Sequence, residues 1–454
     1  MSRRGPDPRL SRRGFGLGIG LSFGAGILGH GSWARSAPPA DPSPSPAAPG
    51  RRPGEGVTAL VGGRLHVGDG KVIEGATVVL RGEAFTSVGG PELRARLAPA
   101  TTIVDVTGKE LTPGLIAADS HLGIVEIDLE PSTRDDSGGD HPVRAAYDAA
   151  EALQPGSSLI QVQAIEGITS AAIAPSGGLL TGQVAWIDLV HGDRKAMRVR
   201  QGVAVRGNLG QVIAGSRAAT LAKLREVLAD ARLYARSRAA HERRQLRDLA
   251  AHPRDLEALG PLLAGKVPLT VRADRESDIV AALDLAAAER IKVVILGGAE
   301  AWRVAGRLAE RNVPVILQPT HNLPGSFDTL GARLDAAAIL RKAGAPVGLA
   351  VLGEAHNLRN LRQECGIAVA NGMAWEEALT AATLAIARAY GQDRDFGSVA
   401  PGKTANLVVW DGDPFELSSA AVQVYIRGEA IPMVSRQTLL RERYRDLSKF
   451  RGSR

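Results

Sequence analysis

Eight short apolar runs of β-type residues recur between residues 114 and 352, separated by stretches with helical spacing. Such alternation is typical of parallel strands joined by helices, and eight units of this kind close into a barrel of ~250 residues. The runs are 114–119, 168–174, 184–189, 203–207, 267–272, 292–297, 313–318 and 347–352. The pattern therefore predicts an α/β fold, a closed parallel (β/α)8 TIM barrel over residues 113–397.

The segments before and after the predicted barrel have a different sequence pattern. Residues 57–112 alternate short β-type runs with glycine turns, and residues 399–431 do the same. We expect the two ends of the chain to pair into one small β-sandwich, formed by residues 56–112 and 398–433. Residues 215–259 are rich in Ala, Leu and Arg and predict a helical insertion after the fourth strand. Residues 434–454 predict a terminal amphipathic helix.

The N-terminus has the pattern of an export signal. Arg12 and Arg13 precede a glycine-rich apolar stretch that ends at Leu28, followed by small residues suited to cleavage. That stretch is about 13 residues long, shorter than the ~20 that span a bilayer. Residues 1–37 thus resemble a twin-arginine signal, the alternative being a basic disordered tail, and residues 38–55 form a Pro-rich linker. The sequence predicts an exported or periplasmic protein without a transmembrane segment.

Charge and cysteine content argue against a nucleic-acid-binding protein and against a fold held by disulfides. The net charge is +7, but the first 36 residues hold six arginines and one aspartate, which leaves +2 for the rest. A nearly neutral body gives no reason to expect a nucleic-acid partner. The chain has one cysteine, Cys365, so an intramolecular disulfide is impossible. Its helix-like surroundings favour a small buried hydrophobe.

Five segments resemble a known family. Residues 107–123 (TGKELTPGLIAADSHLG) and 397–414 (GSVAPGKTANLVVWDGDP) are similar to the entry into and exit from the barrel in the amidohydrolase superfamily. Residues 175–189, 273–279 and 360–372 resemble an imidazolonepropionase-like branch. The resemblance implies a metal-dependent hydrolase of cyclic or other non-peptide amide C–N bonds, acting on a small amide-like substrate at the C-terminal mouth of the barrel. Its divalent metal would activate a water molecule.

The expected metal ligands are largely replaced in this chain. The family's His-x-His pair is here Asp119-Ser120-His121, and Glu354 stands where an aspartate would bind metal and act as the catalytic base. Asp119, His121 and Glu354 are therefore the candidate ligands. The histidine expected on the fifth strand is Arg272, which has no lone pair to donate and carries a permanent charge. We expect Arg272 to replace the metal as a cation paired with Asp119 and Glu354.

Three further residues are candidates for contact with a substrate or for substitute ligands: Glu300, His321 and His356. Glu300 has the alternative role of a first-turn helix acid, and the two histidines that of ordinary loop residues. His66, His141, His191, His241 and His252 are expected at the surface.

Two interpretations of function stay open. In the first, the chain is a degenerate amidohydrolase without a cofactor that binds a small molecule or a catalytic paralogue, with a purely structural subunit as the limiting case. In the second, it is an active C–N hydrolase with one divalent metal, zinc or iron, and an altered ligand set.

Overall fold

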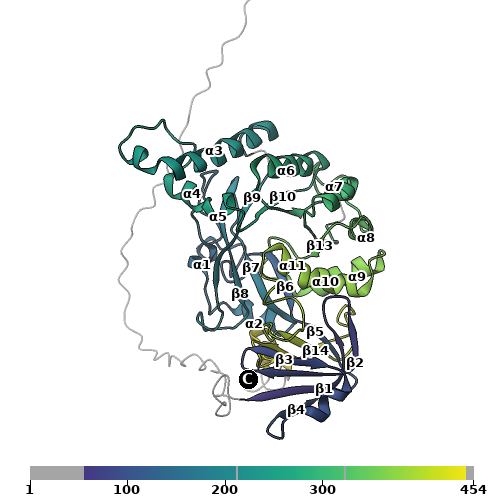
Figure 1. Ribbon diagram of the computed structural model, residues 1–454. Coiled ribbons are helices and arrows are strands. Elements are labelled where there is room, and N and C mark those ends of the chain that lie inside the picture. The colour runs from purple at the N-terminus through teal and green to yellow at the C-terminus, as the bar shows by residue number, and fades with distance from the viewer. Residues whose placement is uncertain (1–55, 211–212, 322–323, 446–454) are drawn as a thin grey trace, which may run out of the picture. The chain divides into compact units, whose positions relative to one another are not determined.

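The computed structural model describes residues 56–210, 213–321 and 324–445 (Figure 1). The predicted signal (1–37) and linker (38–55) lie outside the described residues, as does the end of the predicted terminal helix. Within the described ranges, no helix combines the length and apolar character needed to cross a membrane.

Each of the eight predicted apolar runs overlaps one strand of a single curved sheet. The strands are β6 (Leu115–Ser120), β7 (Ile168–Ile173), β8 (Leu180–Asp188), β9 (Arg200–Asn208), β10 (Leu269–Ala273), β11 (Val293–Gly297), β12 (Val315–Leu317) and β13 (Val347–Leu349). Neighbours in the sheet follow chain order, from β6 at one edge to β13 at the other. The fold is thus a mixed α/β fold built on a curled, barrel-like sheet.

The direction of one strand differs from the prediction of an all-parallel barrel. β8 is antiparallel to both β7 and β9, whereas the other neighbouring pairs in this sheet are parallel. Residues 174–179 join β7 to β8, and Gly177 and Gly178 turn the chain there with φ of +81° and +62°. A parallel connection needs a crossover of about a dozen residues or more, so this short turn reverses the strand.

The sheet is an open half-barrel rather than the closed barrel that we expected. Its strand order ends at β13, with no ladder from β13 to β6 among the described residues. Two backbone hydrogen bonds nevertheless bring the two edges together at their carboxyl ends. Gly353 N donates to Asp119 O at 2.8 Å, and His121 N donates to Glu354 O at 3.0 Å. The candidate residues of the first and last strands therefore meet at one end of the sheet.

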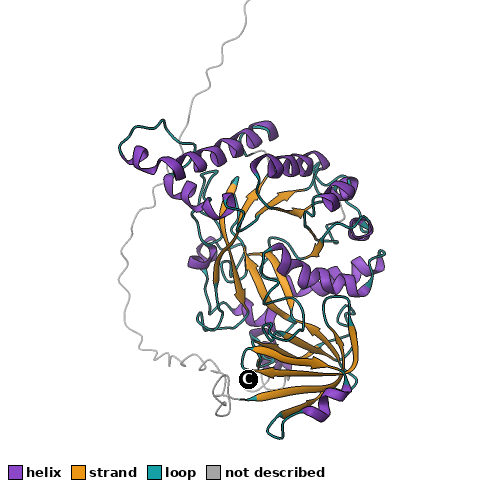
Figure 2. Ribbon diagram, viewed as in Figure 1, coloured by secondary structure: helices purple, strands orange, loops and turns teal. Residues whose placement is uncertain are grey.

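Helices accompany the curved sheet, most of them on its outer side, and the helix Leu384–Ala389 contributes to the cluster on its inner side (Figure 2). They are α1 (Ala149–Ala152), α2 (Ser158–Ala164), α3 (Arg217–Glu242), α4 (Pro253–Ala258), α5 (Gly260–Leu263), α6 (Glu276–Glu289), α7 (Ala305–Glu310), α8 (Ala336–Lys342), α9 (Leu361–Ala370), α10 (Trp375–Ala382), α11 (Leu384–Ala389) and α12 (Arg436–Arg445). The predicted helical stretch 215–259 contains α3 and α4, and Ser216 caps α3 by accepting a hydrogen bond from Ala219 N. Cys365 is buried within α9, as expected.

Both chain ends contribute to one second sheet. Its strands are β1 (Val57–His66), β2 (Val72–Arg81), β3 (Ala84–Gly89), β4 (Thr102–Asp105), β5 (Glu110–Pro113), β14 (Leu407–Trp410), β15 (Ala421–Ile426) and β16 (Glu429–Ala430). β14 pairs with β5 in antiparallel register, with Val408 opposite Thr112. The predicted pairing of the ends is present, but the strands form a single sheet, so the β-sandwich is not confirmed.

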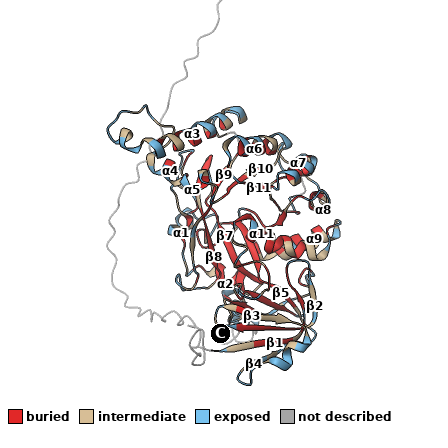
Figure 3. Cartoon of the chain, viewed as in Figure 1, coloured by how far each residue is buried: buried red, intermediate tan, exposed pale blue. Residues whose placement is uncertain are grey.

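Most residues of the curved sheet are buried (Figure 3). Ile116 and Ala118 pack in the inner cluster, whereas Leu115 and Ala117 belong to the outer one, as the alternation of a strand requires. The inner cluster also holds Trp186 and, from the region of α11, Tyr390 and Phe396. Burial on both faces explains why these strands read as nearly continuous apolar runs.

His66 is buried, contrary to the expectation of a surface histidine. Its exposed fraction is 4%. Nδ1 lies 2.6 Å from Glu376 Oε1 on α10, Nε2 lies 2.8 Å from Glu110 Oε2 on β5, and the ring packs on Trp375. Both ring nitrogens thus lie within hydrogen-bond distance of a carboxylate. His66 therefore links the small sheet to α10.

Replacing His66 by Ala is expected to lower the free energy of unfolding by about 2 kcal/mol, since hydrogen bonds to charged groups contribute ~1.5–3 kcal/mol each and these are partly solvated. Urea denaturation measures the loss. His191→Ala is the matched control, because His191 makes one long contact, 3.3 Å from Gly156 O, and its loss is expected to cost less than about 0.5 kcal/mol. Equal losses for the two variants would contradict a structural role for His66.

Candidate functional site at the barrel mouth

Asp119 and Arg206 form a buried ion pair at the mouth of the half-barrel. Asp119 lies on β6 and Arg206 on β9, and their side chains are 4% and 9% exposed. Arg206 Nε donates to Asp119 Oδ1 at 2.5 Å and Nη2 donates to Oδ2 at 3.2 Å. Nη1 donates to Gly207 O and to Asn208 Oδ1. The pair is therefore bidentate, and every nitrogen of this guanidinium is engaged.

The charge of Arg206 keeps Asp119 ionised. Burial by itself raises the pKa of the Asp119 carboxyl, but the charge and hydrogen bonds of Arg206, with smaller contributions from His121 and Arg272, outweigh it and lower the pKa. The backbone of Asp119 is left-handed, with φ of +50°. For a residue other than glycine this costs roughly 1–2 kcal/mol, although Asp adopts it more readily than most. The mouth thus holds a fixed carboxylate in a strained position.

Arg272 pairs with a different partner from the one expected. Its Nε donates to Asp274 Oδ2 at 3.0 Å, and Asp274 Oδ1 accepts from Ala299 N. Side chains two residues apart on an extended chain point to the same side, so Asp274 reaches Arg272 more easily than Asp119 or Glu354 does. The cation paired with Asp119 is Arg206, and the expected trio of Arg272, Asp119 and Glu354 is not formed.

The other two candidates, His121 and Glu354, have backbones that lie close together, but their side chains have different partners. Glu354 Oε2 accepts from Asn357 Nδ2 at 3.2 Å. His121 follows β6 and contributes to lowering the pKa of both Asp119 and the buried Asp136. The backbones of His121 and Glu354 are hydrogen bonded. The structure thus brings Asp119, His121 and Glu354 to the same end of the sheet.

Glu300, His321 and His356 occupy three different surroundings. Glu300 Oε2 accepts from Glu276 N at the start of α6, so it caps a neighbouring helix. His356 lies 3.4 Å from Asp128 Oδ2 and is about a third exposed. His321 lines a small cavity together with Arg272. Burial first, and then the charge of Arg272, lowers the pKa of His321. His321 thus shares a cavity with Arg272, another candidate.

The residues at the mouth do not fit the divalent metal that the resemblance implies. A catalytic zinc has three protein ligands and one open position, whereas both oxygens of Asp119 are bound by Arg206. In the part of the chain that the structure describes, no group of three His, Cys, Asp or Glu residues is arranged to hold a metal ion.

Arg206 is the functional residue that sequence reasoning missed. It stands in the segment GVAVRGNLG, within an otherwise apolar strand. A charge inside such a strand has to be paired when both faces of the sheet are buried. The sequence therefore indicated that Arg206 needs a partner. It did not indicate which one, because Asp119 lies 87 residues away in the chain.

Comparisons with known proteins show a partial match to one family model and a shared fold. Residues 274–436, less than half of the chain, match the amidohydrolase family. No curated protein matches the chain in a sequence search. An amidohydrolase structure from Thermotoga maritima MSB8 is 24% identical, with a TM-score of 0.75 over 83% of this chain and 99% of that one.

Two further structures have weaker similarity. The structure of a molinate hydrolase is 17% identical, with a TM-score of 0.53 over 84% of this chain and 95% of that chain. An adenosine deaminase from Xanthomonas campestris with bound zinc is 17% identical, with a TM-score of 0.50 over 87% and 100% of the two chains. Residues 274–436 thus match the amidohydrolase family, and the chain shares its fold with these three structures.

Proposed function

We propose that this protein is a degenerate amidohydrolase that binds a small amide-like molecule at the barrel mouth and does not carry out metal-dependent hydrolysis. The observation that supports this most directly is the bidentate ion pair of Asp119 with Arg206. The guanidinium supplies a permanent positive charge next to the carboxylate. A divalent metal that binds Asp119 would have to displace the guanidinium of Arg206. Electrostatic repulsion between the two cations opposes this at short range.

The proposal includes three predictions from the sequence. The branch similar to imidazolonepropionase is the proposed origin of the chain, residues 1–37 are the proposed twin-arginine signal, and the protein would work in the periplasm. A catalytic paralogue is the proposed alternative partner to a small molecule. The rival function is an active hydrolase with one zinc or iron ion, favoured by the family match over residues 274–436.

Elemental analysis of the protein purified without chelator distinguishes the two functions. We expect less than about 0.1 zinc or iron per chain, because the Asp119 carboxylate is committed to Arg206 and a zinc site requires about three ligands. Hydrolysis of N-acetylated amino acids and cyclic amides is expected to stay at the background rate after zinc, iron or manganese is added.

About one metal per chain, together with hydrolysis that stops when the metal is removed, would overturn the proposal and establish the rival function. In that case His121→Asn tests the location of the metal. A bound ion at the mouth would be lost from this variant, whereas His191→Asn, remote from the mouth, would keep it.

A further inference from the structure

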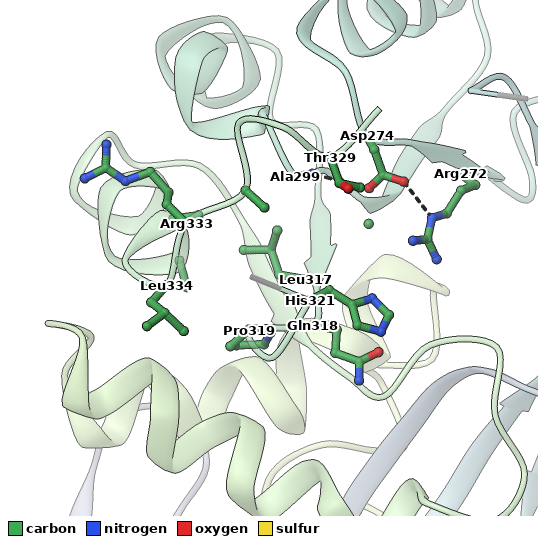
Figure 4. Close-up of a pocket in the computed structure, with 14 residues that line it drawn as sticks. Arg272, Asp274, Ala299, Leu317, Gln318, Pro319, His321, Thr329, Arg333 and Leu334 are labelled. Atoms are coloured by element: carbon green, nitrogen blue, oxygen red, sulfur yellow. Dashed lines mark hydrogen bonds and ion pairs between the residues drawn. The ribbon is translucent and has the colours of Figure 1, made fainter. Parts of the chain in front are cut away.

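A small cavity lies at the carboxyl ends of β10, β11 and β12. Arg272, Asp274, Gln318, His321 and Thr329 are among the residues that line it (Figure 4). Its volume is about 30 Å³. Because a water molecule needs ~10–15 Å³ of such space, the cavity has room for about two water-sized groups. Any ligand group that it accepts must be small.

Arg272 presents unused hydrogen-bond donors to this cavity. Only Nε has a hydrogen-bond partner among the described residues, Asp274, while Nη1 and Nη2 have none. The side chain is 29% exposed. Arg206, in contrast, donates from all three nitrogens. Asp274 therefore holds one edge of the Arg272 guanidinium and leaves the other edge, with its pair of parallel N–H groups, available.

His321 is a second polar side chain of the cavity without a hydrogen-bond partner among the described residues. Figure 4 shows its ring and the Arg272 guanidinium beside the same space. Burial and the charge of Arg272 lower its pKa, so the ring is neutral near pH 7 and offers one N–H donor. The amide of Gln318 is engaged by contrast, with Glu364 and with Leu352 N. Arg272 and His321 are thus the groups left to bind a ligand.

We propose that Arg272 and His321 bind the carboxylate group of a small organic acid in this cavity. This inference rests on the proposed binding function and names its ligand class. A planar carboxylate matches the free edge of a guanidinium with two parallel hydrogen bonds, and its two oxygens take the space of about two waters. A phosphate would bring more oxygens and a second negative charge close to Asp274. The geometry therefore selects a singly charged planar anion.

Binding of N-acetylglycine tests the proposal, because it carries both an amide and a carboxylate. Isothermal titration on the full protein compares it with N-acetylglycinamide, which lacks the carboxylate, and with inorganic phosphate. We expect the acid to bind at least about tenfold more tightly than either comparison ligand, as a charge-assisted bidentate pair predicts. Arg272→Gln is expected to remove that preference, and Arg272→Lys to reduce it, because lysine keeps the charge but loses the fork.

Arg333→Gln is the matched control. Arg333 lines the same cavity, but its guanidinium points away from it (Figure 4) and is bound to Asp335 through Nε and Nη2. This variant is expected to keep the affinity within about twofold. Circular dichroism shows whether each variant is folded.

An acid that binds no better than its amide or than phosphate would overturn the inference, as would equal losses for Arg272→Gln and Arg333→Gln. These outcomes say nothing of metal content, which tests the proposed function separately.

Discussion

Replacing Arg206 by Met is expected to destabilise the protein by about 3–5 kcal/mol, the usual loss when one partner of a buried ion pair is removed. Asp119 would stay in the interior, where its side chain is 4% exposed, without its bidentate partner. Burial would then act unopposed, and the pKa of the Asp119 carboxyl would rise. Urea denaturation gives the change in the free energy of unfolding.

Two comparison variants separate charge from packing. Asp119→Asn combined with Arg206→Met is expected to recover part of the loss, because no buried charge is left unpaired and Asn also tolerates the left-handed backbone at position 119. Arg333→Met removes an exposed pair with Asp335, whose side chains are 41% and 39% exposed, and is expected to cost less than about 1 kcal/mol. An Arg206→Met loss as small as that would contradict the account of a buried charge at the mouth.

Gly297→Ala is expected to cost about 2–5 kcal/mol, from left-handed backbone strain and from overpacking. Gly297 ends β11 with φ of +85°. A Cβ atom there would lie 2.3 Å from Asp274 Oδ1 and 2.8 Å from Arg272 Nε, so the ion pair has to move. We expect binding of N-acetylglycine to weaken at least about tenfold although Arg272 itself is retained.

Gly344→Ala isolates the contribution of the backbone. Gly344 has the same φ of +85°, but its Cβ would have no neighbour closer than 3.9 Å. It is expected to cost about 1–2 kcal/mol and to leave ligand binding unchanged. If Gly297→Ala behaves like Gly344→Ala in both measurements, the position of the Arg272–Asp274 pair does not depend on the glycine, and the steric account is wrong.

Strand identity could be predicted here because its signal is local. The eight apolar runs overlap the eight strands since each strand buries both faces, and the glycine turns near both ends mark the second sheet. The direction of β8 was missed, because it depends on the length of the 174–179 connection rather than on the strand's own residues. The open edge between β13 and β6 likewise follows from how far the whole sheet curls.

The sequence by itself determined which chemistry the mouth retains: Asp119, His121 and Glu354 at strand ends, and arginine in place of an expected ligand. Only the tertiary structure decided how these charges pair. Arg272 bonds to the residue two positions along its own strand, while Arg206 reaches Asp119 from β9. The physical reason is that the curvature of the sheet brings the side chains of β6 and β9 together. A buried carboxylate needs a cation as partner, and Arg206 is the cation that lies beside Asp119.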